Sequence, residues 1–356
     1  MSGIIDYLDK YGDITFKEHP FNEVDALVLS QFTYLKWEHV IPGLLDNSED
    51  GVTLLQMKEL MQPAEVFSQE RSADNNRMLW ERMVSGKRFQ NMRCNYISYE
   101  LRDEVGVQFL AFVVFPEDSL PVILYRGTDE TILGWKEDYA MTMDTPVAGQ
   151  RLASLYLKQV ALRLPGGFNI AGHSKGGNLS VYAAFMADAF TMDRIMDVYN
   201  FDGPHYRPEV IAQGDYARVK DKIHKYIPNA SIIGIMLETE HDYSIIKSKG
   251  LGGGKQHDPY SWETEDDHFI YLDKMEKRSL KMNDSMNLFT QTLSNEQLEI
   301  LGDFIFEIIG GDYATTTEEM AKNKSQSVSS MLTAFKDVEP KTKKAVKNII
   351  KELKNL

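Results

Sequence analysis

The sequence predicts an α/β protein built on a mostly parallel, doubly wound sheet, with helical additions at both ends. Short apolar runs typical of buried strands alternate with helical patterns through the middle of the chain, which is the order found in such sheets. Two strand-like runs that follow each other closely indicate an antiparallel leading edge. The 356 residues are 43% hydrophobic, enough for a large core and compatible with one large α/β unit.

Residues 1–90 are expected to form a helical N-terminal segment that packs on one side of the sheet. Residues 23–32 have helical periodicity, and Asn22 is placed to cap that helix. Residues 54–84 are polar with scattered apolar positions, which favours surface helices.

Residues 91–311 are expected to form the sheet and its connecting helices. Residues 92–99 and 107–115 are rich in β-favouring residues, and a turn is expected at Arg102-Asp103-Glu104. A helix over 147–164 has apolar residues on one face and ends before Pro165-Gly166-Gly167. The remaining strands are expected at 121–125, 168–171, 195–201, 222–226 and 243–246, the last of these completing the sheet.

A helix and a basic tail are expected beyond the sheet. Ser294-Asn295-Glu296-Gln297 is a capping-box pattern that opens a helix with an apolar face through Leu298, Leu301, Phe304, Ile305 and Ile308, and Gly310-Gly311 ends it. Residues 312–356 are then expected to form a polar linker and a basic amphipathic helix at 341–356. The apolar face of that last helix holds Ala345, Val346, Ile349, Ile350 and Leu353.

Charge separates this tail from the body. The formal net charge is −14, and residues 322–356 carry +6, so the first 321 residues carry −20. A body this acidic excludes nucleic acid as its expected partner. The tail helix has two interpretations: it docks on the acidic body, which we favour, or it makes peripheral contact with an anionic membrane.

The expected location is the cytoplasm. Cys94 is the one cysteine, so no disulfide can form within the chain. The N-terminus shows no basic, apolar signal-peptide pattern, and no run of about 18 apolar residues predicts a transmembrane helix.

The pentapeptide Gly172-His173-Ser174-Lys175-Gly176 has the G-x-S-x-G pattern of a nucleophile elbow. An apolar run, 168–171, comes before it and a helix-favouring run, 178–187, comes after it, which is the strand–turn–helix setting that an elbow requires. The alternative is a Gly-rich turn whose serine only caps the helix.

A serine nucleophile needs a general base, and in α/β-hydrolases the chain order is serine, acid, histidine. His257 is the predicted base, because a glycine-rich loop after the last expected strand can carry it across to the elbow. His268 is the reserve. His205 follows a strand end and is expected to line the site, whereas His224 lies inside a strand pattern and is expected to be structural.

Asp202 is the predicted acid. It ends the strand after the elbow, so it is expected at the carboxyl edge of the sheet, where ligands bind. Asp242 is expected at the far edge. The place where many hydrolases carry the acid holds Asn229 and Ser231 instead. The alternative interpretation of Asp202 is a turn aspartate that caps its own loop.

Two backbone donors are expected to form an oxyanion hole. One is the N–H of Lys175, directly after the nucleophile. The other is the N–H of Thr128, in Arg126-Gly127-Thr128 at the end of an earlier strand, with its hydroxyl as a further donor.

No cofactor or metal is expected. Residues 250–255 lack the spacing of a phosphate-binding loop, since Gln256 follows Lys255. The acidic run at 258–268 lacks ligand spacing and is interpreted as a solvated loop.

Over roughly residues 90–260, the chain resembles the class 3 lipases of the α/β-hydrolase fold, and as a whole it is similar to a family of lipase-like proteins found mainly in Firmicutes. The resemblance rests on Tyr125-Arg126-Gly127-Thr128 with Trp135 and Asp138, on Gly172-His173-Ser174-Lys175-Gly176-Gly177, on Phe201-Asp202-Gly203-Pro204, and for the second family on Gln256-His257-Asp258-Pro259-Tyr260-Ser261-Trp262.

The resemblance implies an α/β-hydrolase fold with Ser174 as nucleophile, His257 as base, and Thr128 with Lys175 at the oxyanion hole. The chain departs from the class 3 lipases in three places: residues 228–231 hold no acid, Asp202 stands where glycine is usual, and Lys175 is unusual. The expected function is hydrolysis of a small-molecule or lipid carboxylic ester through an acyl-enzyme on Ser174. The alternative is a catalytically silent hydrolase-fold protein that serves as a binding or scaffold module.

Overall fold

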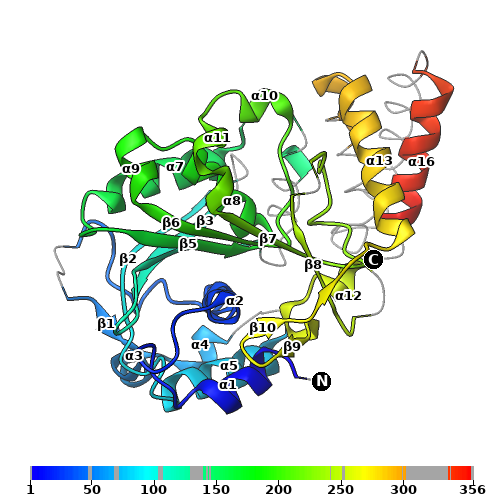
Figure 1. Ribbon diagram of the computed structural model, residues 1–356. Helices are drawn as coiled ribbons and strands as arrows, with labels where there is room; N and C mark the ends of the chain where they lie inside the picture. The colour runs from blue at the N-terminus through cyan, green and yellow to red at the C-terminus, as the bar shows by residue number, and fades with distance from the viewer. Residues whose placement is uncertain are drawn as a thin grey trace, which may run out of the picture.

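A nine-stranded sheet organises the part of the chain that the computed structural model describes, with helices on both of its faces (Figure 1). The predicted α/β architecture is therefore confirmed. The described residues are 2–46, 50–67, 72–102, 107–128, 139–141, 143, 146–240, 242–250, 253–298, 300–301, 336 and 338–353.

The centre of the sheet is parallel. Its strands follow the order β1-β2-β3-β4-β5-β6-β7-β8-β11, and the five from β4 to β8 run in one direction. Their carboxyl ends therefore meet at one edge, where side chains from different strands can form a site. These strands are β4 (Val122–Tyr125), β5 (Phe168–His173), β6 (Ile195–Phe201), β7 (Ile223–Pro228) and β8 (Ser244–Ile246).

Both margins of the sheet are antiparallel. The expected leading hairpin of β2 (Arg93–Arg102) and β3 (Val107–Phe115) is present, and β1 (Val52–Thr53) extends it. Asp103 and Glu104 of the expected turn lie outside the described residues. The expectation that 243–246 completes the sheet is wrong, because β11 (Tyr271–Leu272) pairs with β8. Strand β11 is missed because two residues are too few to show the alternation of apolar and polar positions that predicts a strand.

Strand β3 shows why the sheet needs cover on both sides. Phe109, Ala111 and Val113 belong to one apolar cluster, whereas Leu110, Phe112 and Val114 belong to another. Since successive side chains of a strand point to opposite faces, this run of apolar residues is stable only between two layers of helices.

The N-terminal helices cover one face. Helix α2 lies directly on the sheet, and α1, α3, α4 and α5 lie around it in the lower part of Figure 1. The predicted cap of α2 is present, because the Asn22 side chain accepts from the N–H groups of Val24 and Asp25. The bounds are α1 (Ile4–Tyr11), α2 (Glu23–Phe32), α3 (Leu54–Leu60), α4 (Pro63–Val66) and α5 (Ala73–Ser85).

A fully buried ion pair joins these helices to the chain that follows them. Arg88 donates through Nε to Asp25 at 2.7 Å and through Nη2 at 2.5 Å, and neither side chain is exposed. Its Nη1 donates to the carbonyls of Ile14 and His19 at 3.0 Å each, so the buried guanidinium is well satisfied. Tyr7 donates to the same Asp25 at 2.8 Å, and burial first, then the negative charge of Asp25, raises the pKa of Tyr7.

The opposite face carries helices from the middle of the chain. Helices α7 and α8 pack directly on the sheet, and both end close to the bounds that their sequence patterns predict. These elements are α7 (Ala148–Ala161), α8 (Lys175–Phe185), α9 (Ala189–Arg194), α10 (Pro208–Ile211), α11 (Tyr216–Val219) and a 3-10 turn at Lys220–Lys222.

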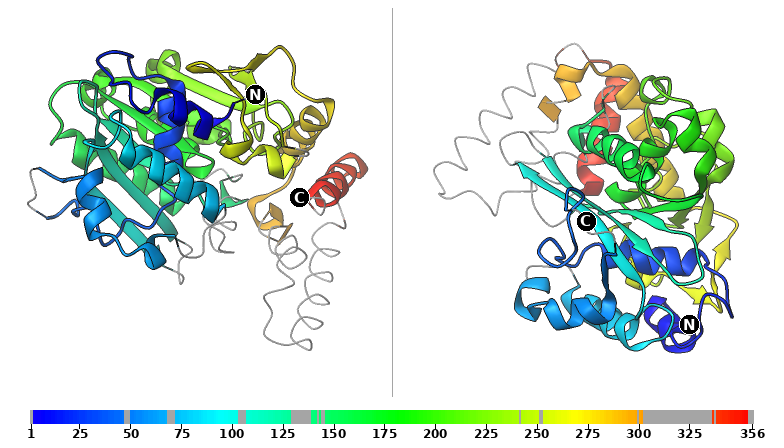
Figure 2. Two further views of the ribbon diagram at one scale, coloured as in Figure 1. Left: turned by 90° about the horizontal axis from the view of Figure 1, so that it is seen from below. Right: turned by 90° about the vertical axis from the view of Figure 1, so that its left-hand side faces the viewer.

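The C-terminal helices α13 (Lys277–Thr292) and α16 (Pro340–Leu353) lie side by side next to β8 (Figures 1 and 2). Val346 is 1% exposed and packs in one cluster with Met282, Met286 and Phe289 of α13. The favoured interpretation of the tail, docking on the body, agrees with this packing. Val346 is the one side chain of the predicted apolar face that the structure describes.

The predicted capping box at Ser294 is present: Ser294 N–H donates to Gln297 Oε1 at 3.1 Å, and Gln297 N–H donates to Ser294 Oγ at 3.3 Å. Leu298 and Leu301 are buried as expected, while 304–326 lie outside the described residues. The predicted division of the chain into an N-terminal segment, a core and a tail, with boundaries at residues 90 and 311, stays a prediction. The smaller elements between β8 and α13 are α12 (Gly253–Gln256), a 3-10 turn (Pro259–Ser261), β9 (Thr264–Glu265) and β10 (His268–Phe269).

Among the described residues, no helix combines the length and the apolar character needed to cross a membrane. Cys94 is buried as a free thiol, and burial raises its pKa, so it is held as the unreactive thiol.

Asp25→Ala is expected to lower the free energy of unfolding by about 3–5 kcal/mol, because it leaves the Arg88 guanidinium buried without its counter-charge. Denaturant unfolding measures the change. The matched control is Asp9→Ala, which removes the exposed partner of Arg82 and is expected to cost less than about 1 kcal/mol. Equal losses in the two variants would contradict the expectation.

Candidate active site

Ser174 occupies a strained turn between β5 and α8. Its φ of 58° and ψ of −129° are rarely adopted by a residue with a side chain. The turn is tight: a Cβ on Gly172 would lie 2.2 Å from the carbonyl oxygen of Gly176, and a Cβ on Gly176 would lie 2.1 Å from that of Tyr125. The two glycines are therefore required by close backbone approach, as the elbow pattern predicts.

The structure brings Ser174, His257 and Asp202 into one hydrogen-bonded chain. Ser174 Oγ lies 2.8 Å from His257 Nε2, and His257 Nδ1 lies 2.6 Å from Asp202 Oδ2. Asp202 is 0% exposed, whereas Ser174 is 7% exposed and the His257 side chain 12%. A serine bonded to an imidazole, itself held by a buried carboxylate, is the arrangement that activates a serine for nucleophilic attack.

Asp202 reaches this position through sheet topology. It follows directly after β6, which is the parallel neighbour of β5, so Ser174 and Asp202 leave adjacent strand ends. Its φ of 54° turns the chain sharply at the strand end. Two donors besides His257 hold the carboxylate: Ser231 Oγ lies 2.7 Å from Oδ2, and Gly234 N–H lies 3.1 Å from Oδ1.

Ser231 and Gly234 are site residues that the sequence pattern does not reveal. Ser231 stands where the resemblance expects an acid, and it instead donates to the acid of the neighbouring strand. Gly234 approaches so closely that a Cβ there would lie 2.1 Å from Asp202 Oδ1. The missing carboxylate at 228–231 is the one signal that could have pointed here, since a hydroxyl in its place suits a partner for a carboxylate contributed from elsewhere.

The loop before His257 is anchored on both sides. Gln256 Oε1 accepts from the N–H of Ala230 at 2.7 Å, which ties the loop to the chain after β7. The Gln256 carbonyl accepts from Trp262 Nε1 at 2.8 Å, and Trp262 is fully buried. The histidine is therefore presented from a fixed stretch of backbone.

Thr128 and Lys175 leave the sheet at the same edge. Tyr125 of β4 pairs in register with Gly172 of β5, and Thr128 and Lys175 each lie three residues beyond that pair. Lys175 is the first residue of α8, where helix N–H groups and the helix dipole favour negative charge. Its side chain is 1% exposed and donates to the carbonyl of Gln108 at 3.0 Å, so the ammonium faces the protein interior. Trp135 and Asp138 lie outside the described residues.

The remaining acid and base candidates lie elsewhere. His224 lies 2.7 Å from Asp197, and the reserve base His268 is exposed beside Asp267. Asp242 is exposed and pairs with Lys220. None of these hydrogen bonds or ion pairs joins them to Ser174.

His205 belongs to a separate buried cluster rather than to the serine site. Lys225 Nζ donates to Glu238 Oε2 at 2.7 Å, and His205 Nδ1 lies 3.9 Å from the same oxygen. Burial lowers the pKa of His205 to about 4, although Glu238 acts in the opposite direction. The expectation that His205 lines the catalytic site is not supported by any contact with Ser174, His257 or Asp202.

Among the described residues, no group of three or more histidine, cysteine, aspartate or glutamate side chains is placed to hold a metal ion. Within the acidic run at 258–268, Asp258 accepts from the N–H of Tyr260, and Glu263 pairs with Lys247 at 3.4 Å. These contacts are structural.

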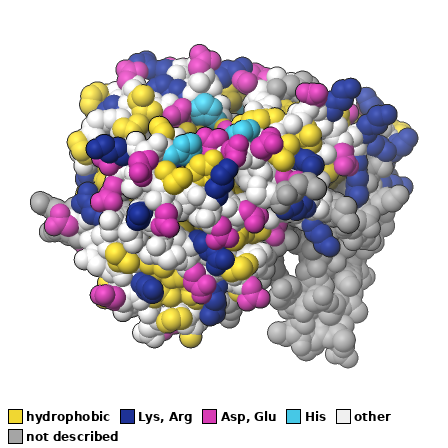
Figure 3. Space-filling view, turned by 60° about the horizontal axis from the view of Figure 1, so that its bottom comes forward, with side chains coloured by type: hydrophobic (Ala, Val, Ile, Leu, Met, Phe, Trp, Pro, Cys, Tyr) yellow, Lys and Arg dark blue, Asp and Glu magenta, His cyan; other side chains and the backbone are white. Residues whose placement is uncertain are grey.

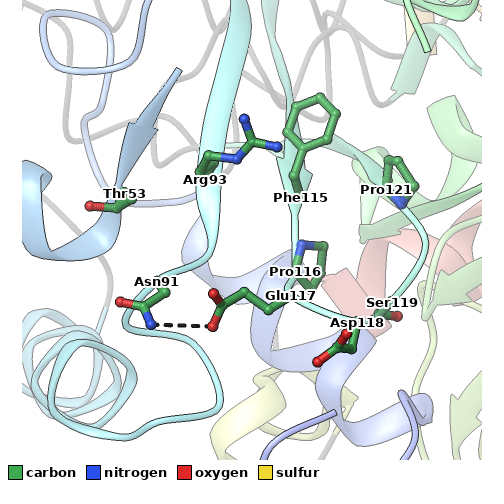
Figure 4. Close-up of a pocket in the computed structure, with 9 residues that line it drawn as sticks. All are labelled: Thr53, Asn91, Arg93, Phe115, Pro116, Glu117, Asp118, Ser119 and Pro121. Atoms are coloured by element: carbon green, nitrogen blue, oxygen red, sulfur yellow. Dashed lines mark hydrogen bonds between the residues drawn. The ribbon is translucent and has the colours of Figure 1, made fainter. Parts of the chain in front are cut away.

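A cavity of about 620 Å³ is lined by residues around the turn between β3 and β4, and Ser174 is not among them (Figure 4). It opens where β3 ends and β4 begins, which is the edge opposite the carboxyl ends of the parallel strands. Arg93 lies over the Phe115 ring at 5.4 Å there, and Asn91 donates to Glu117 at 3.2 Å. We assign this cavity no part in the chemistry of Ser174.

Comparison with known proteins gives one family. A family model described as Mbeg1-like matches residues 83–307, well over half of the chain. No curated protein matches. Among solved structures, the crystal structure of M37 lipase matches with a TM-score of 0.36 and 15% sequence identity, over 60% of this chain and 70% of that chain.

Lowering the pH is expected to destabilise the protein through His205. Between pH 6.5 and about 4, the unfolded chain binds a proton at this side chain and the folded chain does not, so the free energy of unfolding falls by up to about 3 kcal/mol. His205→Gln is expected to flatten this part of the profile, measured by urea unfolding across the range. The exposed His268→Gln serves as the control, and identical slopes for both variants would contradict the assignment.

Proposed function

The chain belongs to the Mbeg1-like family, which is lipase-like, and from this premise and the contacts of Ser174 we propose that it is a serine hydrolase of the α/β-hydrolase fold that cleaves carboxylic esters. The proposal rests above all on one observation, the hydrogen-bonded chain from Ser174 through His257 to Asp202.

In the proposed reaction, Ser174 Oγ attacks the ester carbonyl while His257 Nε2 takes its proton. Asp202 keeps the proton on Nδ1 and stabilises the imidazolium that forms. The C–O bond to the alcohol then breaks, the alcohol leaves with the proton from Nε2, and an acyl-enzyme remains on Ser174. Water attacks this acyl group with His257 again as base, which releases the acid and restores the serine.

Negative charge on the carbonyl oxygen needs donors that are already in place. The N–H of Lys175 at the start of α8 supplies one in this proposal, and Thr128 supplies the other from the end of β4. Removing one such donor typically raises the barrier by about 3 kcal/mol. The Lys175 side chain is 1% exposed and its ammonium donates to the Gln108 carbonyl, so in this proposal Lys175 offers the substrate its backbone N–H and not its side chain.

The alternative, a silent hydrolase-fold scaffold, draws its support from the missing acid at residues 228–231. The contact of Asp202 with His257 weakens that support, because the acid comes from β6 instead. A scaffold also has no need for a strained Ser174 whose hydroxyl faces an imidazole.

Ser174→Ala, His257→Ala and Asp202→Asn are each expected to lower kcat/KM for p-nitrophenyl esters about a thousandfold or more, because the three groups act as a unit. Hydrolysis is measured across a series of acyl lengths, and the length that is preferred begins to define the substrate. The matched controls are the rejected candidates, His268→Ala and Asp242→Asn, which are expected to retain activity.

A fluorophosphonate probe separates enzyme from scaffold. The wild type is expected to label at Ser174, and Ser174→Ala is expected not to label. A wild type that hydrolyses no ester and takes no label would place the scaffold function first.

We also propose that the protein is cytoplasmic and that the basic C-terminal helix α16, docked on α13, makes peripheral contact with anionic membranes. Lys341, Lys344 and Lys347 are exposed on α16, and basic side chains gather over the C-terminal helices at the right of Figure 3. Because Val346 is buried against α13, this helix does not offer it for insertion, and the attraction in this proposal is electrostatic.

Replacing Lys341, Lys344 and Lys347 by Gln is expected to reduce sedimentation with phosphatidylserine vesicles at low salt roughly a hundredfold, at ~1 kcal/mol per lysine. The control replaces exposed lysines on other elements, Lys58, Lys87 and Lys158. Vesicles of phosphatidylcholine alone are expected not to bind. Equal binding to both lipids, or by both variants, would rule out this surface.

A further inference from the structure

We propose that Tyr34 and His173 form a positioning pair that fixes the backbone of the catalytic histidine, an inference that rests on the proposed hydrolase function. His173 Nε2 lies 2.9 Å from the carbonyl oxygen of His257, and Tyr34 Oη lies 2.9 Å from His173 Nδ1. The contacts thus run from the N-terminal segment, through the residue before the nucleophile, to the base.

The chemistry of the partners fixes where the protons lie. A carbonyl oxygen only accepts, so His173 Nε2 carries the proton and donates it to His257. In the neutral ring Nδ1 is then an acceptor, and the Tyr34 hydroxyl donates to it. Tyr34 therefore stabilises the one neutral tautomer of His173 that can hold the His257 carbonyl.

The His173 ring is buried and packs against the rings of His257 and Trp262, which fixes its position. Its centroid lies 4.6 Å from that of His257 and 5.9 Å from that of Trp262, and the residue is 5% exposed. Trp262 donates to the Gln256 carbonyl, and His173 donates to the next carbonyl along, that of His257. Two consecutive carbonyls are thus fixed, which leaves the His257 side chain as the movable part of the base.

Such anchoring matters because four of the five residues at 250–254, shortly before the base, are glycine, and glycine restricts the backbone less than any other residue type. A displacement of about 1 Å in a reacting group can cost a factor of about 100 in rate. Since His173 precedes Ser174 directly, the pair ties the backbone of the base to the backbone of the nucleophile.

Tyr34 also lies against the proposed oxyanion strand end. A Cβ on Gly127 would lie 2.0 Å from Tyr34 Oη and 2.6 Å from the carbonyl oxygen of His173. Only glycine at 127 leaves room for the Tyr34 hydroxyl. Tyr34 follows α2 and lies outside the residues that the family model matches, so this contribution comes from the N-terminal segment.

Tyr34→Phe removes only the hydroxyl and is expected to lower kcat roughly tenfold with KM unchanged, as the loss of one buried hydrogen bond predicts. The matched control is Tyr7→Phe, which removes a buried hydroxyl of the same segment that bonds to Asp25. That control is expected to lower stability and leave kcat unchanged. Equal effects of the two variants on kcat would overturn the proposal.

The role of His173 is tested by removing its hydrogen-bond donor and then restoring a donor with a different side chain. His173→Phe removes the donor to His257 and is expected to lower kcat roughly a hundredfold. His173→Gln restores an N–H donor near the Nε2 position and is expected to recover most of that loss. Wild-type kcat in His173→Phe, or no recovery in His173→Gln, would overturn the positioning role.

A readout without turnover separates this proposal from the proposed function. Nitrogen-15 spectra of labelled histidine distinguish the two neutral tautomers, and His173 is expected to be protonated at Nε2 in the wild type and mixed in Tyr34→Phe. An unchanged tautomer in that variant would overturn the pair even if the enzyme is active. If the wild type has the expected tautomers but hydrolyses no ester, the Tyr34–His173 pair stands and the proposed hydrolase function is wrong.

Discussion

The buried carboxylate of Asp202 is the contact on which the site depends. It is 0% exposed, and three donors from two parts of the chain meet on it: His257 Nδ1 from one loop, and Ser231 Oγ and Gly234 N–H from the loop after β7. Leaving a carboxylate in a dry interior is costly unless such partners surround it. The loop after β7 and the loop of the base are therefore held together by the acid, and the orientation of His257 toward Ser174 follows from that.

The parallel sheet makes this convergence possible. Strands β4, β5 and β6 end at one edge, and they deliver Thr128, Ser174 and Asp202 within a few residues of their last hydrogen-bonded pairs. Short loops after fixed strand ends leave little conformational freedom, so the positions of these groups are set largely by β-pairing. His257 comes from much farther along the chain, which is why its loop carries additional anchors at Gln256 and at its own carbonyl.

Much of this arrangement can be predicted from the sequence, because Ser174 and Asp202 directly follow strands whose apolar patterns are visible in the sequence. Strand β6 begins and ends at the predicted residues 195 and 201, and the elbow pattern predicts the strand–turn–helix around Ser174. The strands β1 and β11 are missed because two residues carry no periodicity. Ser231, Gly234 and Tyr34 are missed for another reason: their side chains or N–H groups meet the site only through loop paths that no periodic pattern encodes.

The N-terminal segment and the C-terminal helices both contact residues close to the site. On one side, Tyr34 lies beside Gly127 and His173. On the other, α13 and α16 share an apolar cluster with Ile232 and Ile233, the residues between Ser231 and Gly234. Packing of the C-terminal pair therefore supports the loop that holds Asp202, much as the N-terminal segment supports the backbone of His257. A change in either end can reach the proposed site through one loop, without altering Ser174, His257 or Asp202.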